Sequence, residues 1–488
     1  MSTFNLIRNS RVFFTTNVAA GTGVVAASGF TTSNSQEIQV LDGFTFSQAS
    51  NADTVTIAEA GVAPVRGQRA FNTSLAQVEF SFSSYVRPRL SGGLVTAEES
   101  HLWNALLSAT PIGASPTSTA TTFTTVTVSA GVATLIGTGF TAGIPSGTVL
   151  VIKGVTGLGA SQFNTAIKLS AASTTTTISG TYLVAPTASV TLGNWTSAVT
   201  FNETAWNANT AQAADLVATP GIPSAYSSIT TANANKNQLL PFGMVITVDT
   251  VTYVIDNCAM DQAVIDFGLD GIATIAWTGK GTVLRQLASN VAYSAVTNPV
   301  ISGGLAGTIT GKVTNANFIT NKLSTVTLVK NIGGIGAGNT AYTLALTGGS
   351  LTISNNIGFV TPANLGIVNV PIGYYTGTRA ISGSLTAYLR TGSTNTAGLL
   401  ADLLAAAATT DGIEPKFRLQ LEVGGASNGT RVEFEVTGAF LQIPTIETQA
   451  VMSTTVNFVA QGTDSVQGAN ANYDIENTND LVVRYLSL

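Results

Sequence analysis

The chain has 488 residues, and at roughly 100 to 200 residues per domain this length allows about three domains. Only 9% of the residues are charged while 44% are hydrophobic, which excludes a disordered chain because disorder requires the opposite balance. The 20 basic residues are spread along the chain and the net charge is -5, so tight binding of nucleic-acid phosphates is not expected.

Residues 1–66 predict strands and loops. The strand candidates are residues 11–16 and 54–58, and Asp42-Gly43 and Gly61 supply turns. The N-terminal stretch MSTFNLIRNS lacks the basic-then-apolar pattern of a signal peptide, and no apolar stretch is long enough for a membrane helix. We therefore expect a chain that is made and used in soluble form.

Residues 67–109 predict a strand followed by a helix. Apolar and polar residues alternate from Ala76 to Ser83, which is the period of a half-buried strand. Thr96 and Glu99 have capping-box spacing, so we expect the helix to begin there. The apolar face of the strand comprises Ala76, Val78, Phe80 and Phe82, and the helix has an apolar stripe of Leu102, Ala105, Leu106 and Ala109.

Residues 110–200 predict a separate unit, because Lys153 and Lys168 are the only charged residues in this stretch. Gly and Ser turns separate short strand candidates, a pattern typical of a small Ig-like β-sandwich. The candidates are residues 124–128, 132–136, 148–153, 166–169 and 175–179. The stretches FTAGIPSGTVLVIKGVTG and FNTAIKLSAASTTTTISG resemble small β modules inserted in phage virion proteins.

Residues 201–237 predict a return linker, after which the core formed by residues 1–109 resumes over residues 238–290. In this second part Asp270-Gly271 is suited to a tight hairpin turn. The strand candidates are residues 244–249, 252–255, 260–267 and 272–278.

Residues 291–317 predict a second linker and residues 318–463 a second core. This core contains a helix candidate at residues 395–408, with Asn395 or Thr396 as its cap. An acidic, Asn-rich tail, residues 464–488, ends in an expected edge strand. The strand candidates of the second core are residues 385–389, 417–423, 430–440 and 449–460.

Three groups of residues recur in the same order along the chain, which predicts a tandem duplication with one insertion. Phe4, Ser10, Val12 and Phe14 recur 314 positions on as Phe318, Ser324, Val326 and Leu328. Gly67, Arg69, Ala70, Ser74 and Leu75 recur 310 positions on as Gly377, Arg379, Ala380, Ser384 and Leu385. Ile275, Trp277, Gly281 and Thr282 recur 181 positions on as Val456, Phe458, Gly462 and Thr463.

Candidate catalytic residues are nearly absent. His101 is the only histidine, which excludes a two-histidine metal site, and it falls inside the predicted helix as an ordinary helix residue. Cys258 is the only cysteine, which excludes an internal disulfide, and we interpret it as an inert core thiol. The glycine-rich stretch at residues 332–339 lacks the full dinucleotide fingerprint.

Three aspartates could suggest a calcium site. Asp256, Asp261 and Asp266 follow one another at five-residue steps, which alternate between the two faces of a strand. We therefore expect them at the edges of loops rather than around an ion. The sequence predicts no enzyme activity, no metal and no cofactor.

The chain resembles phage major tail tube proteins. The likeness covers residues 1–108 and 238–284 in one copy and 318–463 in the other. The residues that carry it are NLIRNSRVFF, QVEFSFSSYVRPR before TAEESHLWNALL, CAMDQAVIDFGLDGIATIAWTGKG, and RVEFEVTGAFLQI with AVMSTTVNFVAQG. The resemblance implies two tandem β-barrel or sandwich cores, each flanked by one helix, with the Ig-like module inserted. The chain departs from the family's one-core form, in which six subunits make a ring.

The resemblance also implies a function. We expect a structural virion protein of the phage tail, assembled in the host cytoplasm, whose two-core chains form trimeric rings of pseudo-sixfold symmetry. The expected partners are other copies of the chain, the tape measure, terminator and distal tail or baseplate proteins, and transiting viral DNA without tight binding. No membrane partner is expected.

The polar strand faces are the candidates for a channel wall, because a wall free of cations would let DNA slide. They comprise Gln77, Glu79, Ser81 and Ser83 in the first copy and Glu433, Glu435 and Thr437 in the second. Contact with a neighbouring subunit or with outer solvent is the alternative for these faces.

Two other functions stay open. The first is a surface adhesin or decoration protein that binds host glycan through the inserted module, which needs aromatic platforms. The second is a glycan-degrading tailspike, which needs paired carboxylates on a groove. The acid-free residues 110–200 disfavour the tailspike for this segment.

Overall fold

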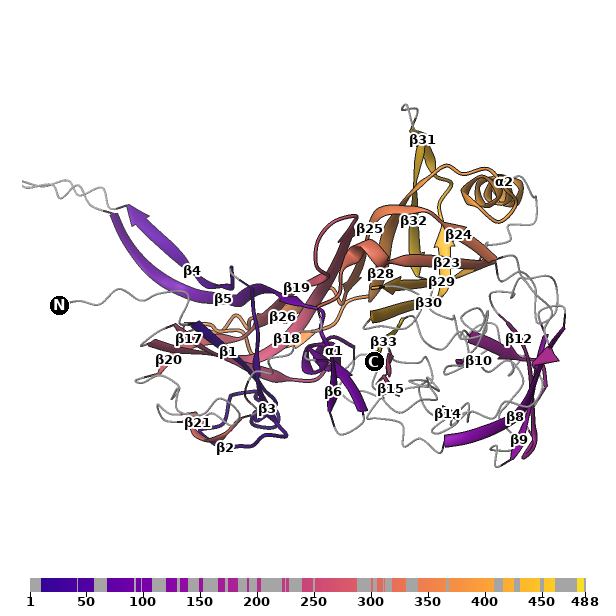
Figure 1. Cartoon of the computed structure of the whole chain (residues 1–488). Coiled ribbons are helices and arrows are strands. Elements are labelled where there is room, and N and C mark those ends of the chain that lie inside the picture. The colour runs from indigo at the N-terminus through magenta and orange to yellow at the C-terminus, as the bar shows by residue number, and fades with distance from the viewer. Residues whose placement is uncertain are drawn as a thin grey trace, which may run out of the picture.

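The computed structural model of the chain is mainly β, as the sequence predicts (Figure 1). It describes residues 10–41, 43–56, 68–91, 94–97, 99–107, 120–129, 132–138, 149–151, 166–171, 174–182, 191–192, 200–202, 222–223, 225–227, 239–248, 251–287, 300–301, 305–309, 311, 318–330, 341–365, 368–407, 416–424, 431–447, 452–460 and 481–486.

In the first half, the strands lie in the order β3, β1, β17, β18, β19, β5, β4, each antiparallel to the next. A further strand, β20, pairs with β18, and helix α1 follows β5 in the chain. The bounds are β1 Ser10–Thr15, β3 Ser35–Ile38, β4 Thr45–Thr56, β5 Gln68–Tyr85, α1 Ser100–Leu107, β17 Phe242–Val248, β18 Val251–Gly268, β19 Thr274–Gly281 and β20 Val283–Leu287.

The second half has the order β24, β23, β29, β30, β32, β28, β25, again antiparallel throughout. Here β33 pairs with β30, β31 pairs with β32, and helix α2 follows β28. The bounds are β23 Thr325–Lys330, β24 Ala341–Leu344, β25 Leu346–Ser354, β28 Ala380–Tyr388, α2 Thr396–Ala407, β29 Lys416–Val423, β30 Arg431–Leu441, β31 Thr445–Glu447, β32 Ser453–Ala460 and β33 Val482–Leu486.

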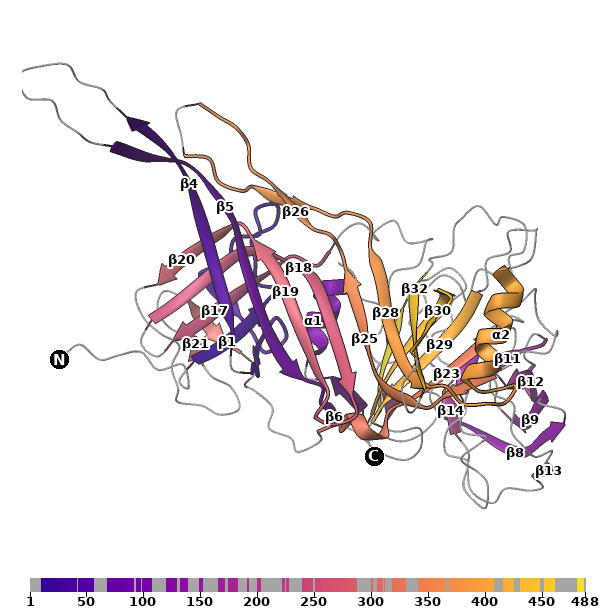
Figure 2. The ribbon, with the colours of Figure 1, turned by 90° about the horizontal axis from the view of Figure 1, so that it is seen from above.

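The two halves are joined by a strand pair. β18 of the first half pairs with β25 of the second, from Gln262 opposite Ser354 to Gly268 opposite Gly348. The strands from β4 to β32 therefore lie side by side across both halves (Figure 2).

Each half has two layers around an apolar core. Phe80 of β5 meets Phe242 of β17 edge to face across this core, with ring centroids 6.4 Å apart. Both side chains belong to one buried cluster that includes the apolar residues of α1 and of the second half. Burial of this cluster follows from the alternation of each strand, because every second side chain points inward.

A short three-stranded sheet covers the outer layer of the first half. Its strands are β2 Ser28–Phe30, β22 Ala306–Thr308 and β21 Val300–Ile301. Phe30 and Leu305 from this region pack with Phe13 of β1 in a separate buried cluster. Strands β1 and β17 are consequently buried on both faces over most of their length.

The inserted unit forms one antiparallel sheet in the order β10, β11, β12, β9, β8, β13, with β14 also on β8. A sandwich requires a second sheet, and much of residues 110–200 lies outside the described residues, so the Ig-like sandwich stays a prediction. The bounds are β8 Ala120–Ser129, β9 Val132–Thr138, β10 Val149–Val151, β11 Ala166–Leu169, β12 Thr177–Tyr182, β13 Thr191–Leu192 and β14 Thr200–Asn202.

The predicted start of the first helix is wrong. Thr96 lies in β7 (Leu94–Ala97), opposite Arg89 of β6 (Pro88–Ser91), so its backbone is committed to strand pairing. The helix begins at Ser100, and the Glu99 carbonyl accepts hydrogen bonds from Leu102 N at 2.9 Å and from Trp103 N at 3.2 Å. The expected stripe is confirmed at Leu102, Ala105 and Leu106, which are buried, and Ala109 lies outside the described residues.

The strands expected at residues 252–255 and 260–267 form one strand, β18, which is irregular between Met260 and Gln262. Asp256, Asp261 and Asp266 all lie within it, so their placement at loop edges is wrong. The second helix is confirmed to within one residue at each end.

The expected linkers contain strands. β15 (Ile222–Pro223) pairs with β7, and β16 (Ala225–Ser227) pairs with β33. The C-terminal strand is confirmed as β33, but it lies between β30 and β16 and is not an edge. Strands β26 (Gly358–Val360) and β27 (Gly373–Tyr375) form a hairpin of their own, and residues 321–323 form a 3-10 turn.

Candidate functional site

One polar face of the sheet runs without interruption across both halves, and we call it the wall. It consists of the residues on strands β4 to β32 that point away from the core, and all of them are exposed or half-buried. Four rows of paired residues define the wall. They are Tyr85, Thr274, Asp266, Ser350, Ser384 and Asn457; Ser83, Ala276, Val264, Thr352, Ser382 and Val459; Thr45, Ser81, Thr278, Gln262, Ser354 and Ala380; and Ser47, Glu79 and Lys280.

The wall is polar because each strand alternates. On β5, Val78, Phe80 and Phe82 are buried in the core, whereas the intervening Glu79 is exposed and Ser81 is half-buried. The same alternation holds on β25, where Leu351 and Ile353 are buried and the residues between them belong to the wall. Small hydroxyl side chains dominate the rows, so the wall is polar with few charges.

Hydroxyl pairs connect neighbouring strands of the wall. Thr45 Oγ1 and Ser81 Oγ lie 2.7 Å apart, and Ser350 Oγ and Ser384 Oγ lie 3.2 Å apart. In each pair either hydroxyl can donate. These bonds satisfy the hydroxyl groups within the wall and leave a surface of short side chains.

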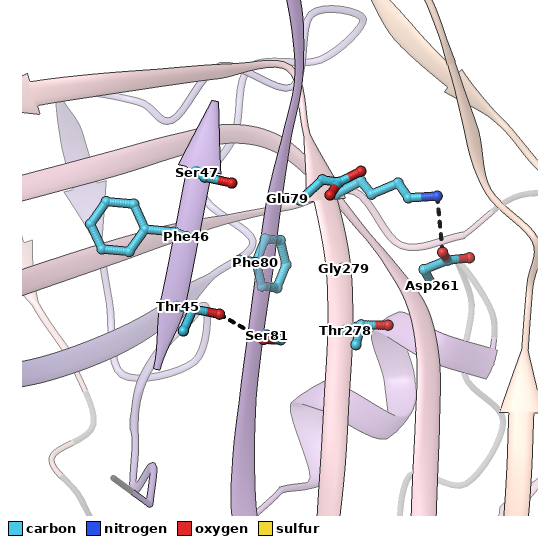
Figure 3. A pocket seen from close by; sticks show the side chains of 10 residues that line it. Thr45, Phe46, Ser47, Glu79, Phe80, Ser81, Asp261, Thr278 and Gly279 are labelled. Atoms are coloured by element: carbon cyan, nitrogen blue, oxygen red, sulfur yellow. Dashed lines mark hydrogen bonds and ion pairs between the residues drawn. The ribbon is translucent and has the colours of Figure 1, made fainter. Parts of the chain in front are cut away.

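A hollow of about 330 Å³ lies on the wall where β4, β5, β19 and β18 meet (Figure 3). Lys280 Nζ lies 3.0 Å from Asp261 Oδ2 and donates to the carbonyl oxygen of Ile357 at 2.7 Å. Asp261 Oδ1 accepts a hydrogen bond from Ile357 N at 2.8 Å. The lining residues are Thr45, Phe46, Ser47, Glu79, Phe80, Ser81, Asp261, Thr278, Gly279 and Lys280.

The structure places the two predicted groups of polar residues on different layers. Gln77, Glu79, Ser81 and Ser83 lie on β5, in the layer that carries the wall. Residues 433, 435 and 437 alternate on β30 with Val432, Phe434 and Val436, which are buried in the core. This part of β30 pairs with β29 and β33, which belong to the other layer.

The remaining candidate residues are structural in their contacts. The His101 ring stacks on Phe14 with centroids 5.6 Å apart, and burial lowers the pKa of His101. Burial raises the pKa of the Cys258 thiol well above its ordinary value. Asp256 Oδ1 accepts a hydrogen bond from Arg285 Nη2 at 2.8 Å. Within the described part of the chain, no group of three or more His, Cys, Asp or Glu side chains could hold a metal ion.

Two strand edges of the wall layer are open. β4 pairs only with β5, and β31 pairs only with β32, among the described strands. These edges lie at the two ends of the row of strands that carries the wall. An open edge presents unpaired backbone N–H and C=O groups that can pair with another chain.

The comparison with curated proteins relates the chain to a phage protein. It is 25% identical over 496 residues to "Tail tube protein pb6" of Escherichia phage T5, and the match covers 98% of this chain and 78% of the T5 protein. No protein-family model matches the chain. Among the described residues, no helix is long and apolar enough to cross a membrane. The near-complete coverage supports a relationship to phage tail tube proteins.

Proposed function

We propose that this chain is the tail tube protein of a phage, a structural virion protein without enzyme activity. The match to the T5 protein over 98% of the chain supports this function. The observation that carries the proposal is the uninterrupted wall, which is polar and has few charges, with an open strand edge at each end.

The repeated strand order supports an origin by tandem duplication. Val12 pairs with Ile246, which pairs with Tyr253, and Val326 pairs with Leu421, which pairs with Phe434. The recurrence of Val12 as Val326 therefore predicts that Tyr253 corresponds to Phe434. This offset, 434 minus 253, is the same 181 that separates Trp277 from Phe458.

The recurrence of residues 67–75 as residues 377–385, at an offset of 310, does not fit the correspondence of strands that the pairing gives. Trp277 lies opposite Phe82, and Phe458 lies opposite Gly383. Gly383 therefore takes the place of Phe82, an offset of 301 (383 minus 82). Arg69 and Arg379 consequently occupy different positions along their strands, and their similarity does not support the duplication.

The strand pair within the chain suggests how chains join. By the two strand orders, β4 of the first half corresponds to β25 of the second, and β31 takes the place of the last part of β18. If the halves are equivalent, β4 of one chain can therefore pair with β31 of the next chain, as β25 pairs with β18 within one chain. In the resulting ring, three chains of eight strands each give a circumference of about 115 Å at ~4.8 Å per strand. The backbone diameter is then about 37 Å or more, because strand tilt widens a barrel. Such a channel admits a DNA duplex.

The partners follow from this role. Stacked rings require contacts between copies of the chain, and the ends of a tube require other tail proteins such as the tape measure, the terminator and the distal tail or baseplate. The tube lies in the virion tail after assembly in the host cytoplasm. Viral DNA passes the wall without tight binding, because the wall rows contain a single cation.

A disulfide experiment tests ring closure. Thr45 corresponds to Thr352, because Thr45 pairs with Ser81 and Thr352 pairs with Ser382, 301 positions after Ser81. Val264 corresponds to Gln442, because Val264 pairs with Ala276 and Gln442 N donates to the carbonyl oxygen of Asn457, 181 positions after Ala276. Thr45 of one chain should therefore lie opposite Gln442 of the next, as Thr352 lies opposite Val264 within the chain. Both Thr45 and Gln442 are exposed. Directly opposed residues of antiparallel strands have a separation that a disulfide can span. Oxidation of tubes of the Thr45→Cys/Gln442→Cys variant should give covalent dimers and trimers on a denaturing gel, with no larger species.

The Val264→Cys/Thr352→Cys variant is the matched control, because its disulfide forms within one chain and leaves the chain monomeric on the gel. A ladder that continues to six chains would refute the trimer. Electron microscopy of the unmodified protein tests the broader function: the absence of tubes under all assembly conditions would contradict the tail tube proposal itself.

A further inference from the structure

The four rows of the wall contain one lysine, and its ammonium group is paired inside the protein. Lys280 is the only cation in the four rows that define the wall. Its ammonium group contacts the carboxylate of Asp261 at 3.0 Å and the carbonyl oxygen of Ile357 at 2.7 Å, and its side chain is only 24% exposed. Glu79 lies directly opposite Lys280 on the neighbouring strand.

The position of Asp261 depends on the irregularity in β18. Met260 pairs with Gly279 and Gln262 with Thr278, so Asp261 is the extra residue between them. This residue reaches both Lys280 and the backbone of Ile357, which follows β25 in the second half. Two of the three ammonium hydrogens are thereby used inside the protein.

We infer that Asp261 and Glu79 withhold Lys280 from transiting DNA, so that the four rows that define the wall offer no free cation to the phosphates. This inference rests on the proposed tail tube function. A lysine free to bind phosphate would appear three times in every trimeric ring and would hold DNA by releasing its counterions. The carboxylates remove this interaction while Lys280 still joins the two halves of the chain.

A comparison with the second half supports a functional link between Lys280 and the two carboxylates of Glu79 and Asp261. At the 181 offset Lys280 corresponds to Gln461, and at the 301 offset Glu79 corresponds to Ala380. Asp261 has no counterpart, because the equivalent residues Ala439 and Phe440, which pair with Ala460 and Val459, follow each other directly in β30. The second half therefore lacks the cation and both carboxylates together. A wall that needed only negative charge would have no reason to lose the acids where the lysine is absent.

Charge-matched variants test the inference. Glu79→Gln/Asp261→Asn removes both carboxylates and keeps an oxygen that can accept from Ile357 N. Adding Lys280→Gln to this variant removes the cation as well. Tubes of each variant are first imaged by electron microscopy and then sedimented with a short DNA duplex in a salt series.

The carboxylate-free variant should retain DNA, and with three lysines per ring its DNA affinity should fall about 40-fold between 50 and 200 mM salt. The triple variant and the natural protein should release DNA throughout the series. The recovery in the triple variant separates the effect of charge from any loss of the contact to Ile357. Tubes of normal shape that release DNA in all three proteins would overturn the inference, whereas failure of the natural protein to form tubes would instead contradict the proposed function.

Discussion

The indole ring of Trp103 lies with its centroid 6.1 Å from the ring of Phe434, and this contact joins the helix of the first half to a strand of the second. Trp103 is fully buried and also meets Trp277 edge to face at 5.1 Å. At the C-terminal end of the same helix, Arg379 Nη2 of the second half donates to the carbonyl oxygen of Leu107 at 2.6 Å. The two halves therefore share a core and should unfold together.

Trp103→Ala should lower the free energy of unfolding by about 3 to 5 kcal/mol, because it removes a large buried side chain and leaves a cavity. Urea unfolding of the unassembled chain, followed by circular dichroism, measures this change, and a single transition is expected. Leu365→Ala is the control, since Leu365 is fully exposed and its truncation should change stability by no more than about 0.5 kcal/mol. Two separate transitions in the natural chain would contradict the shared core.

Stability should fall as the pH drops below the ordinary histidine pKa of 6.5. Burial lowers the pKa of His101 in the folded chain, so the unfolded chain binds the proton more readily between the two pKa values. His101→Phe keeps a ring to stack on Phe14 and should reduce the loss of stability between pH 7.5 and pH 5. Urea unfolding at both pH values measures the effect, and equal losses in the two proteins would assign the pH dependence to other groups.

The two predicted acidic groups should differ in their effect on DNA. Glu79→Lys adds a cation to the wall and should slow DNA ejection from phage particles, more strongly at low salt, where attraction to phosphate is less screened. Glu433→Lys/Glu435→Lys changes positions on the other layer and should leave the ejection rate unchanged. Fluorescence of a DNA-binding dye follows ejection in both variants. Slow ejection in the second variant alone would place the channel on the other side of the sheet.

The inserted unit should be dispensable for tube assembly. Its strands form a sheet that is separate from the one that carries the wall. Replacing residues 110–200 by a short Gly-Ser bridge should therefore leave tubes that electron microscopy shows with unchanged length per ring and a thinner outline. Loss of all tubes, while the shortened chain still unfolds cooperatively, would show that the insert contributes to ring contacts.

Local alternation was enough to predict the strands that border the core. Val78, Phe80 and Phe82 are buried as their spacing predicts, and the polar residues between them lie on the opposite face. The full length of β4 was not predictable, because Ser, Asn and Asp are disfavoured in strands and β4 gains its order from pairing with β5. The capping-box pattern at Thr96 failed for the same reason, since pairing with Arg89 overrides the local preference for a helix.

The site was only partly predictable. Glu79 was found as a polar strand residue, but the contact between Lys280 and Asp261 depends on one extra residue in β18 and on a backbone group 96 residues away from Asp261 in the chain. The sequence also did not predict in which layer residues 433 and 435 lie. Alternation separates core positions from the other positions of a strand, but it does not assign the strand to one of the two layers.

The strand pair between β18 and β25 changes how a ring assembles from its parts. If three chains close a ring of six cores, as proposed above, every second junction is already made within one chain, where its partner is present at a fixed high effective concentration. Three chains must then meet in solution instead of six. In such a ring, the amount of closed ring would rise with the third power of the chain concentration instead of the sixth, so tubes would begin to grow at a lower concentration of the chain.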